Sequence, residues 1–151
     1  MGLVNFNLKK MILIDGPISP GLIAEVIEKA VNNAETGGHS IFIGEVRRDN
    51  ISGRSVRAIE YSAYEEMVMG ETDKIRKLIL SEFDDVKAIR ILHSKGVVNA
   101  GEISLLVAVS AGHRQQAMTA CAKAVELVKE RLPVWKKEIF DDNTDQWKQN
   151  D

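Results

Sequence analysis

The sequence predicts an α+β fold of mostly antiparallel strands with three helices, in a single domain that spans residues 1–151. Strand and helix patterns follow one another in the order β-α-β-β-α-β-β-α-β-β. Neighbouring strands that are joined without a helix favour antiparallel pairing over a doubly wound parallel sheet. A length of 151 residues with 44% hydrophobic side chains suits one domain with a substantial core.

An apolar run and a helix-start signal mark the first strand and the first helix. Met11–Asp15 is a short apolar segment typical of a strand. Ser19 and Pro20 have the residue types of an N-cap and a first helical position, and apolar residues follow at helical spacing. We expect Gly37 and Gly38 to end this helix.

The middle of the chain predicts two strands, a helix and two further strands. Ser40–Arg47 and Val56–Ala63 are rich in β-branched and aromatic residues, with a polar loop between them. Apolar residues then keep helical spacing over Met67–Phe83. Val86–His93 and Glu102–Ser110 return to strand patterns, and apolar residues on both faces of the second indicate burial on both sides.

The third helix has the clearest pattern, because one apolar stripe runs from about Arg114 until Pro133 stops it. Cys121 lies in the middle of this stripe, so we expect a small buried hydrophobic residue rather than a nucleophile. The segments Lys136–Phe140 and Gln146–Asn150 are expected to form a terminal hairpin.

Composition and charge exclude several classes of function. A formal charge of -2 does not favour a polyanion binder, and 5% aromatic residues are too few for base stacking. A single cysteine cannot close an intrachain disulfide or supply a zinc-finger ligand set. No apolar run approaches the roughly eighteen residues that cross a bilayer, and we expect no secretory signal. We therefore expect a cytoplasmic protein that binds neither nucleic acid nor a membrane.

Four arginines form the first group of candidate binding residues. Arg47, Arg48, Arg54 and Arg57 cluster at a strand end and in the loop that follows it. Rigid scaffolds often present binding residues at such places. Taken alone, the cluster is more typical of a solvated charged loop.

A second candidate site lies between the last buried strand and the third helix. His113 and Arg114 fall at the helix N-terminus, where unpaired N–H groups and the helix dipole favour a phosphate or carboxylate. An arginine in the first turn opposes the dipole, so a structural role alone would favour Asp or Glu there. His39 and His93 have no such surroundings, and we expect both to be ordinary surface or core residues.

Lys129 and Lys136 are candidates for catalysis. On a helical wheel Lys129 lies at the border of the buried stripe, so its stem can cover apolar surface while its amine points into a cleft. Lys136 belongs to the extended segment after Pro133, and a turn there can fold it back toward Lys129. The structural alternative is that lysines near a helix C-terminus merely complement the dipole.

Three segments share their order and spacing with one known family. They are Phe42–Arg47, Ser110–Arg114 and Lys129–Glu138. Together they resemble the family of molybdopterin synthase catalytic (large) subunits, and the resemblance extends over nearly the whole chain. One departure lies after Arg47, where the family often has Arg-Asn-His-Asn and this chain has Arg-Arg-Asp-Asn, with Asp49 in third place.

The resemblance implies an α/β-hammerhead-like fold and a homodimer with a small ubiquitin-like subunit at each end, a heterotetramer. The small subunit would end in a Gly-Gly thiocarboxylate, insert its tail into a pocket and transfer sulfur to cyclic pyranopterin monophosphate, forming the molybdopterin dithiolene. No metal and no cofactor are implied. By the same resemblance Lys129 and Lys136 are catalytic, and the residues that bind substrate are Glu45, Val46, Arg47, His113, Arg114, Lys129, Lys136, Lys137 and Glu138.

The residue types fit this chemistry. Arginine and lysine stabilise charge on a leaving oxygen, and the replacement of oxygen by sulfur needs acid-base help. We hypothesise that Lys129, crowded by Lys136 and Arg114, is the acid-base group. Two alternatives stay open: a Schiff-base lyase that uses Lys129 on a phosphorylated carbonyl substrate, and a non-catalytic module that binds a ubiquitin-like tail or a small anion.

Overall fold

The computed structural model describes residues 12–148, and its elements confirm an α+β fold with three helices and a mostly antiparallel sheet. The expected boundaries at Met11 and Asn150 lie outside the described residues. No helix within 12–148 has the length and apolar composition needed to cross a membrane. In chain order the elements are β1 (Leu13–Asp15), α1 (Pro20–Ala30), β2 (Gly38–Glu45), β3 (Asn50–Ile51), β4 (Arg54–Ala63), α2 (Glu65–Glu82), β5 (Val86–Asn99), β6 (Ile103–Ala111), α3 (Arg114–Arg131), β7 (Val134–Phe140) and β8 (Asp145–Lys148).

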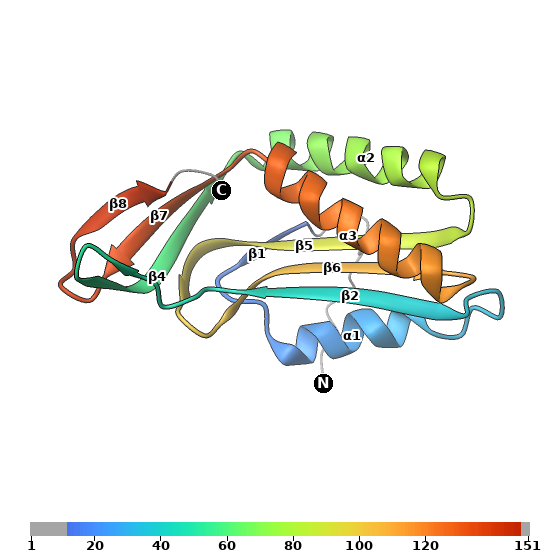
Figure 1. The fold of residues 1–151 in the computed structure, drawn as a ribbon, viewed down its shortest axis with the longest axis horizontal. Coiled ribbons are helices and arrows are strands. Elements are labelled where there is room, and N and C mark those ends of the chain that lie inside the picture. The colour runs from blue at the N-terminus through green and yellow to red at the C-terminus, as the bar shows by residue number, and fades with distance from the viewer. Residues whose placement is uncertain (1–11, 149–151) are drawn as a thin grey trace.

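The strands follow the order β2-β6-β5-β4-β7-β8, with β1 added to β5 and β3 paired with β4. Among the strand pairings within residues 12–148, only that of β1 with β5 is parallel. β5 joins two regions of the sheet, because its first half pairs with β6 and its second half with β4. Gly96 lies at this change with a φ of 90°, a left-handed backbone that favours glycine. Figure 1 shows β4, β7 and β8 as a separate region beyond the ends of β2 and β6.

Helices cover both faces of the region formed by β2, β6 and β5 (Figure 1). α1 lies on one face, where Val26 packs into a core with Leu106. α2 and α3 cover the other face, where Ile75 and Val125 join a larger core that contains Val107. Since successive residues of a strand point to opposite faces, β6 supplies both cores. The prediction that this strand is buried on both sides is confirmed.

The end of α1 differs from the sequence prediction. The helix ends at Ala30 rather than at Gly37, and Asn32 follows with a φ of 76°. Gly37 has a packing role instead, because a Cβ at this position would lie 2.1 Å from the carbonyl oxygen of Gly112. The absence of a side chain at Gly37 therefore allows the chain to pass close to the segment before α3.

The structure contains two strand segments that the sequence did not predict. β5 continues past His93 to Asn99, and the short strand β3 forms in the expected loop after Arg47. Both segments have polar residues and a glycine in or beside them, so their sequences lack the apolar alternation that predicts a strand. Backbone pairing with β4 provides the hydrogen bonds that make these segments strands.

Candidate active site

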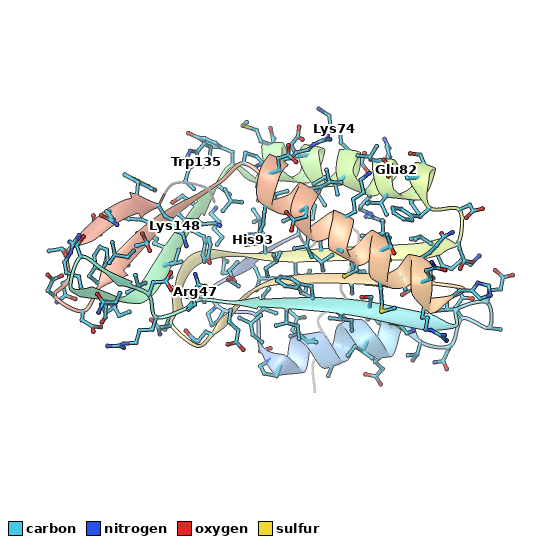
Figure 2. All side chains as sticks on the ribbon, in the orientation of Figure 1. Arg47, Lys74, Glu82, His93, Trp135 and Lys148 are labelled. Atoms are coloured by element: carbon cyan, nitrogen blue, oxygen red, sulfur yellow. The ribbon has the colours of Figure 1, made fainter. Side chains whose placement is uncertain are left out.

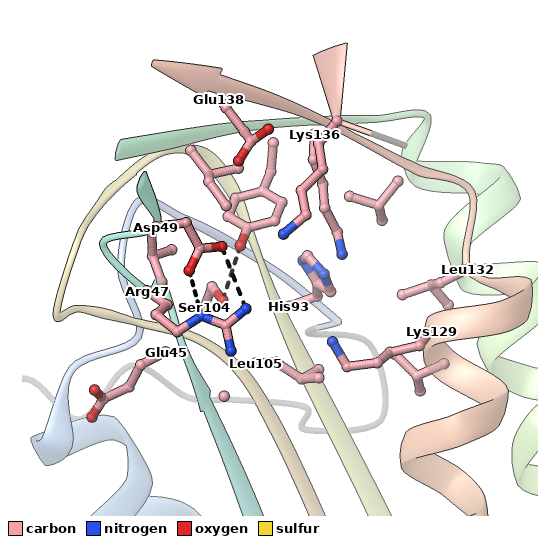
Figure 3. Close-up of a pocket in the computed structure, with 17 residues that line it drawn as sticks. Glu45, Arg47, Asp49, His93, Ser104, Leu105, Lys129, Leu132, Lys136 and Glu138 are labelled. Atoms are coloured by element: carbon pink, nitrogen blue, oxygen red, sulfur yellow. Dashed lines mark hydrogen bonds and ion pairs between the residues drawn. The ribbon is translucent and has the colours of Figure 1, made fainter. Parts of the chain in front are cut away.

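An open cavity of about 440 Å³ lies where the two regions of the sheet meet the C-terminal end of α3 (Figure 3). Four basic side chains line it, those of Arg47, Lys129, Lys136 and Lys148, against three acidic ones. This excess of positive charge suits a small anion. The other lining residues are Gly44, Glu45, Val46, Asp49, Ile59, Tyr61, His93, Ser104, Leu105, Val128, Leu132, Val134 and Glu138.

Lys129 and Lys136 reach this cavity from two different elements. Lys129 lies in the last turn of α3, and Pro133 follows the end of the helix. The chain then enters β7, where strand alternation places Lys136 and Glu138 on the cavity side. Figure 3 shows both lysine side chains pointing into the cavity. The turn at Pro133 therefore brings the two lysines to one site.

Arg47 and Asp49 form an ion pair at the cavity (Figure 3). Nε of Arg47 lies 2.5 Å from Oδ1 of Asp49, and Nη2 lies 3.3 Å from Oδ2. The guanidinium of Arg47 holds the pKa of the Asp49 carboxyl below its ordinary value, and the charge of Lys148 acts in the same direction. Asp49 stands where the resembled pattern has histidine, so this chain places a carboxylate beside a basic residue of the site.

The other three arginines of the predicted cluster bind the turn between β7 and β8 instead of the cavity. In this turn they contact carboxylate, hydroxyl and amide oxygens, and these contacts join the hairpin to β4 and to the segment before β3. The contacts are Arg48 with Asp141, Arg54 Nη1 with Thr144 Oγ1 at 2.9 Å, and Arg57 Nη2 with Asn143 Oδ1 at 3.1 Å.

His113 and Arg114 lie at the opposite end of α3, outside the cavity of their own chain. At a rise of about 1.5 Å per residue, the helix places Arg114 about 22 Å from Lys129. The backbone N–H of His113 donates to Oδ2 of Asp85 at 2.7 Å, and Nδ1 lies 3.0 Å from the same oxygen. The expected convergence within one chain is therefore wrong for His113 and Arg114, and Arg114 does not crowd Lys129.

Lys137 lies on the opposite face of β7 from Lys136. Its Nζ is 3.6 Å from Oε1 of Glu60 and 5.2 Å from the centroid of the Trp147 ring. Strand alternation explains this placement, because neighbouring residues of a strand point to opposite faces. The expected position of Lys137 in the pocket is therefore wrong.

His93, Tyr61, Ser104 and Lys148 line the cavity and were not expected there. His93 is 6% exposed, its ring meets that of Tyr61 edge-on at 5.1 Å, and the Tyr61 hydroxyl donates to Ser104 Oγ at 3.1 Å. Burial lowers the pKa of His93 to about 4, and the charges of Lys136 and Lys129 act in the same direction. The one sequence signal for His93 is an imidazole at the end of an otherwise apolar strand segment.

In the described part of the chain, neither a low-pKa thiol nor a metal site accompanies these residues. Cys121 is buried in α3, its Sγ lies 3.7 Å from the carbonyl oxygen of Val107, and burial raises the pKa of the thiol. These surroundings match the expected small hydrophobic residue. Across residues 12–148, no group of three or more His, Cys, Asp or Glu side chains is arranged to hold a metal ion.

The fold and the cavity define an α+β domain with two lysines in an open, basic cavity. Comparison with known families then gives a specific result, because the model of the family described as MoaE protein matches residues 18–131. The chain therefore belongs to this family, whose curated relatives are molybdopterin synthase catalytic subunits.

Two relatives show the extent of the similarity. The molybdopterin synthase catalytic subunit of Dictyostelium discoideum is 40% identical over 124 residues, covering 81% of this chain and 78% of that protein. The protein of the same name from Pyrococcus abyssi is 46% identical over 112 residues, covering 74% of each. The chain is thus an enzyme subunit of molybdopterin synthesis.

Solved structures have the same fold. Molybdopterin synthase from Staphylococcus aureus aligns with a TM-score of 0.81 at 29% identity, covering 93% of this chain and 97% of that chain. A complex of subunits 1 and 2 of molybdopterin-converting factor from Helicobacter pylori aligns with a TM-score of 0.77 at 20% identity, covering 93% and 90%. At its lower identity, the second structure supports the fold alone.

Proposed function

We propose that this chain transfers sulfur from the thiocarboxylated C-terminus of a small ubiquitin-like subunit to cyclic pyranopterin monophosphate, forming the molybdopterin dithiolene. The observation that carries the proposal is the meeting of Lys129 and Lys136 in one open, basic cavity with Arg47 at the same site. Membership of a family of molybdopterin synthase catalytic subunits supports the same reaction.

In the proposed reaction each transfer forms a carbon–sulfur bond and breaks a carbon–oxygen bond of the substrate. Water then cleaves the link between sulfur and the small subunit, whose tail leaves as an ordinary carboxylate. Arg47 and Lys136 hold the negative charge of the phosphate and the leaving oxygen. Lys129 supplies and removes protons as the acid-base group. Glu45, Val46 and Glu138, which line the cavity, contact the substrate or the tail.

The proposed tail suits the size and charge of the cavity. A volume of about 440 Å³ lies within the range of sites for small ligands. Two glycines without side chains can pass beside the pterin, and a terminal thiocarboxylate is an anion that Lys129, Lys136 and Lys148 attract. The positive charge of the cavity thus suits both proposed reactants, the phosphate-bearing pterin and the anionic tail.

We further propose a homodimer that pairs through β2, with a small subunit on each copy. Within residues 12–148, β2 has β6 as its single neighbouring strand, so its outer edge is unpaired. Ile41, Phe42 and Ile43 along this strand are 36%, 37% and 43% exposed. Native proteins usually cover such an apolar edge, and a second copy of the same strand would do so.

Antiparallel pairing of two β2 strands would also assign a role to His113 and Arg114. The Gly38 end of β2 lies against Arg114, where a Cβ on Gly38 would be 3.4 Å from Cα of Arg114. The other end, at Glu45, borders the cavity. Two-fold pairing would therefore bring His113 and Arg114 of one copy beside the cavity of the other copy, where they could bind its substrate.

We place the protein in the cytoplasm. The sequence has one cysteine, Cys121, whose side chain is buried and which cannot form a disulfide within the chain. A chain without a disulfide suits a reducing compartment.

Reconstitution tests the proposed function. The chain is co-purified with a small protein that ends in Gly-Gly, and the complex is mixed with cyclic pyranopterin monophosphate. Sulfurated pterin should form with the thiocarboxylated partner and not with its carboxylate form. A reduced imine after borohydride treatment would support the Schiff-base lyase instead, and tail binding without turnover would support a non-catalytic module.

A further inference from the structure

Asp85 is a carboxylate that the proposed reaction does not use, and it lies against His113 at the N-terminal end of α3. It belongs to the turn between Glu82, the last residue of α2, and Val86, the first residue of β5 (Figure 2 labels Glu82). Figure 1 shows the end of α2, the start of β5 and the start of α3 at the same end of the sheet. This turn therefore faces the segment that carries His113.

Hydrogen bonds fix this turn to the start of α3. The backbone N–H of Gly112 donates to the carbonyl oxygen of Asp85 at 3.0 Å, and the N–H of Asp85 donates to Oε1 of Gln116 at 2.9 Å. Nε2 of Gln116 donates to Oδ1 of Asp84 at 2.9 Å. The Asp85 side chain is 21% exposed and that of His113 is 87% exposed. A carboxylate on a fixed backbone thus contacts a ring that solvent alone would leave in several rotamers.

Gly112 leaves the space that this carboxylate occupies. A Cβ at position 112 would lie 2.3 Å from Oδ1 of Asp85, too close for two atoms that are not bonded. Among residues 12–148, Gly112 is not one of the glycines with a positive φ, so its backbone conformation does not require glycine. The missing side chain instead admits the carboxylate beside the next residue, His113.

One oxygen of Asp85 receives both contacts from His113. The backbone N–H of His113 donates to Oδ2 at 2.7 Å, and Nδ1 of the ring lies 3.0 Å from the same oxygen. The hydrogen bond from the ring, together with the one from the backbone, holds the pKa of the Asp85 carboxyl below its ordinary value of 3.8. The ionised carboxylate only accepts hydrogen bonds, so Nδ1 carries the hydrogen of this contact. Nε2, at the tip of the ring, is then the nitrogen that can meet a ligand.

We propose that Asp85 is a positioning residue: its carboxylate fixes the ring of His113 through Nδ1, so that Nε2 points toward the substrate in the cavity of the other copy. The inference rests on the proposed function, in which paired β2 strands bring His113 beside that cavity. Asp85 does not itself touch the substrate. It reduces the number of orientations of an exposed ring before the substrate binds, and such pre-organisation lowers the cost of binding.

Nitrogen-15 NMR of the histidine-labelled chain tests the contact without substrate or small subunit. His113→Ala identifies the resonances of this ring. At a pH where the ring is neutral, His113 of the wild type should have a protonated Nδ1 and an unprotonated Nε2. Asp85→Ala should shift the ring toward the form with hydrogen on Nε2, which a free imidazole prefers. Hydrogen on Nε2 in the wild type would overturn the proposal, even if Asp85→Ala failed to fold.

Two substitutions of Asp85 separate the orientation of the ring from the loss of charge. Asp85→Asn can keep both contacts on one carbonyl oxygen, and its kcat/KM for cyclic pyranopterin monophosphate should stay within about twofold of wild type. Asp85→Ala removes both contacts and should lower kcat/KM by about 3- to 10-fold, mainly through a higher KM, as expected for one hydrogen bond. Rates are measured in the complex with the thiocarboxylated small subunit. A kcat/KM unchanged in Asp85→Ala would contradict the proposal.

Asp84→Ala is the matched control, because Asp84 lies in the same turn and binds Gln116 rather than His113. It removes the same charge and a contact with α3, but it should change neither kcat/KM nor the NMR spectrum of the His113 ring. A loss equal to that of Asp85→Ala would show that the turn acts through its stability or charge, and would overturn the positioning role.

A double-mutant comparison tests whether Asp85 acts through the ring of His113. In a His113→Ala background the additional Asp85→Ala change should have no further effect on kcat/KM, because the ring that it positions is absent. Equal losses with and without the ring would overturn the proposal. Failure of the proposed function gives a different pattern: His113→Ala alone would leave kcat/KM unchanged, while NMR would still show the ring held through Nδ1.

Discussion

Arg47 and Asp49 meet through two contacts at the cavity, with Nε 2.5 Å from Oδ1 and Nη2 3.3 Å from Oδ2. A carboxylate paired side-on with a guanidinium has the geometry that an arginine offers to a phosphate. The Arg47 side chain is 80% exposed and that of Asp49 is 27% exposed. Asp49 therefore competes, as a tethered anion, with any phosphate that binds to Arg47.

This competition predicts that Asp49→Asn strengthens substrate binding. The side chain keeps its shape but loses its charge, so KM for cyclic pyranopterin monophosphate should fall. An exposed pair contributes no more than about 1 kcal/mol, which corresponds to a decrease of about fivefold or less. Steady-state kinetics at low and high salt measure the effect. Asp73→Asn on α2 is the control, and a rise in KM for Asp49→Asn would show that the carboxylate positions Arg47 instead.

Removal of either cavity lysine should stop product formation. Lys129→Ala and Lys136→Ala each delete an ammonium group from the proposed acid-base and charge-stabilising site, and we expect losses of at least about 100-fold in single-turnover rate. Binding of the small subunit, measured by calorimetry, should persist. Lys123→Ala provides the matched control, because Lys123 lies on the same helix but pairs with Glu82 away from the cavity. An active Lys129→Ala enzyme would refute the acid-base assignment.

Cys121→Ser should keep activity while reducing stability. Cys121 is buried and its Sγ contacts the Val107 carbonyl rather than the cavity. A hydroxyl in this apolar position should lower the free energy of unfolding by about 1–2 kcal/mol, as urea titration can measure. Because burial raises the pKa of the thiol, alkylation of the native wild-type protein should also be slow. A folded but inactive serine variant would show that the sulfur takes part in the reaction.

Subunit exchange can test whether His113 acts across a dimer. Mixed Lys129→Ala and His113→Ala subunits form hybrid dimers in which one cavity has the intact lysine and faces the intact His113 of the other copy. After full exchange about one quarter of wild-type activity should return, since half of the dimers are hybrids with one complete site each. If His113 served the cavity of its own chain, neither site of a hybrid would be complete and the mixture would stay inactive.

The separation of His113 from Lys129 shows what the sequence could and could not predict. Local patterns predicted the three helices and the hairpin, because spacing, caps and Pro133 act over short distances. The length of α3 was also present in the sequence, and its rise already excludes a shared pocket within one chain. Two features could not be predicted from the local pattern. One is the change of pairing along β5, from β6 to β4, which forms the cavity where His93 lies with the two lysines. The other is the pairing of β7 with β8, which adds Lys148 to the cavity.

The buried His93 predicts how stability depends on pH. Its pKa falls from an ordinary 6.5 to about 4 in the folded protein. As the pH falls through this window, the unfolded chain binds a proton that the folded chain does not, so the free energy of unfolding decreases. The contribution of His93 is complete above pH 6.5 and decreases by up to about 3 kcal/mol by pH 4.

His93→Asn removes this titrating group, so its urea-unfolding free energy should vary less with pH between 6.5 and 4 than that of wild type. Both proteins are compared at one protein concentration, because dimer formation also stabilises the folded state. Asp49, Asp85 and Asp142 have pKa values held below the ordinary 3.8, so their contributions decrease at more acidic pH, outside this window. Equal slopes for the two proteins would show that the pKa of His93 stays near its ordinary value in the folded protein.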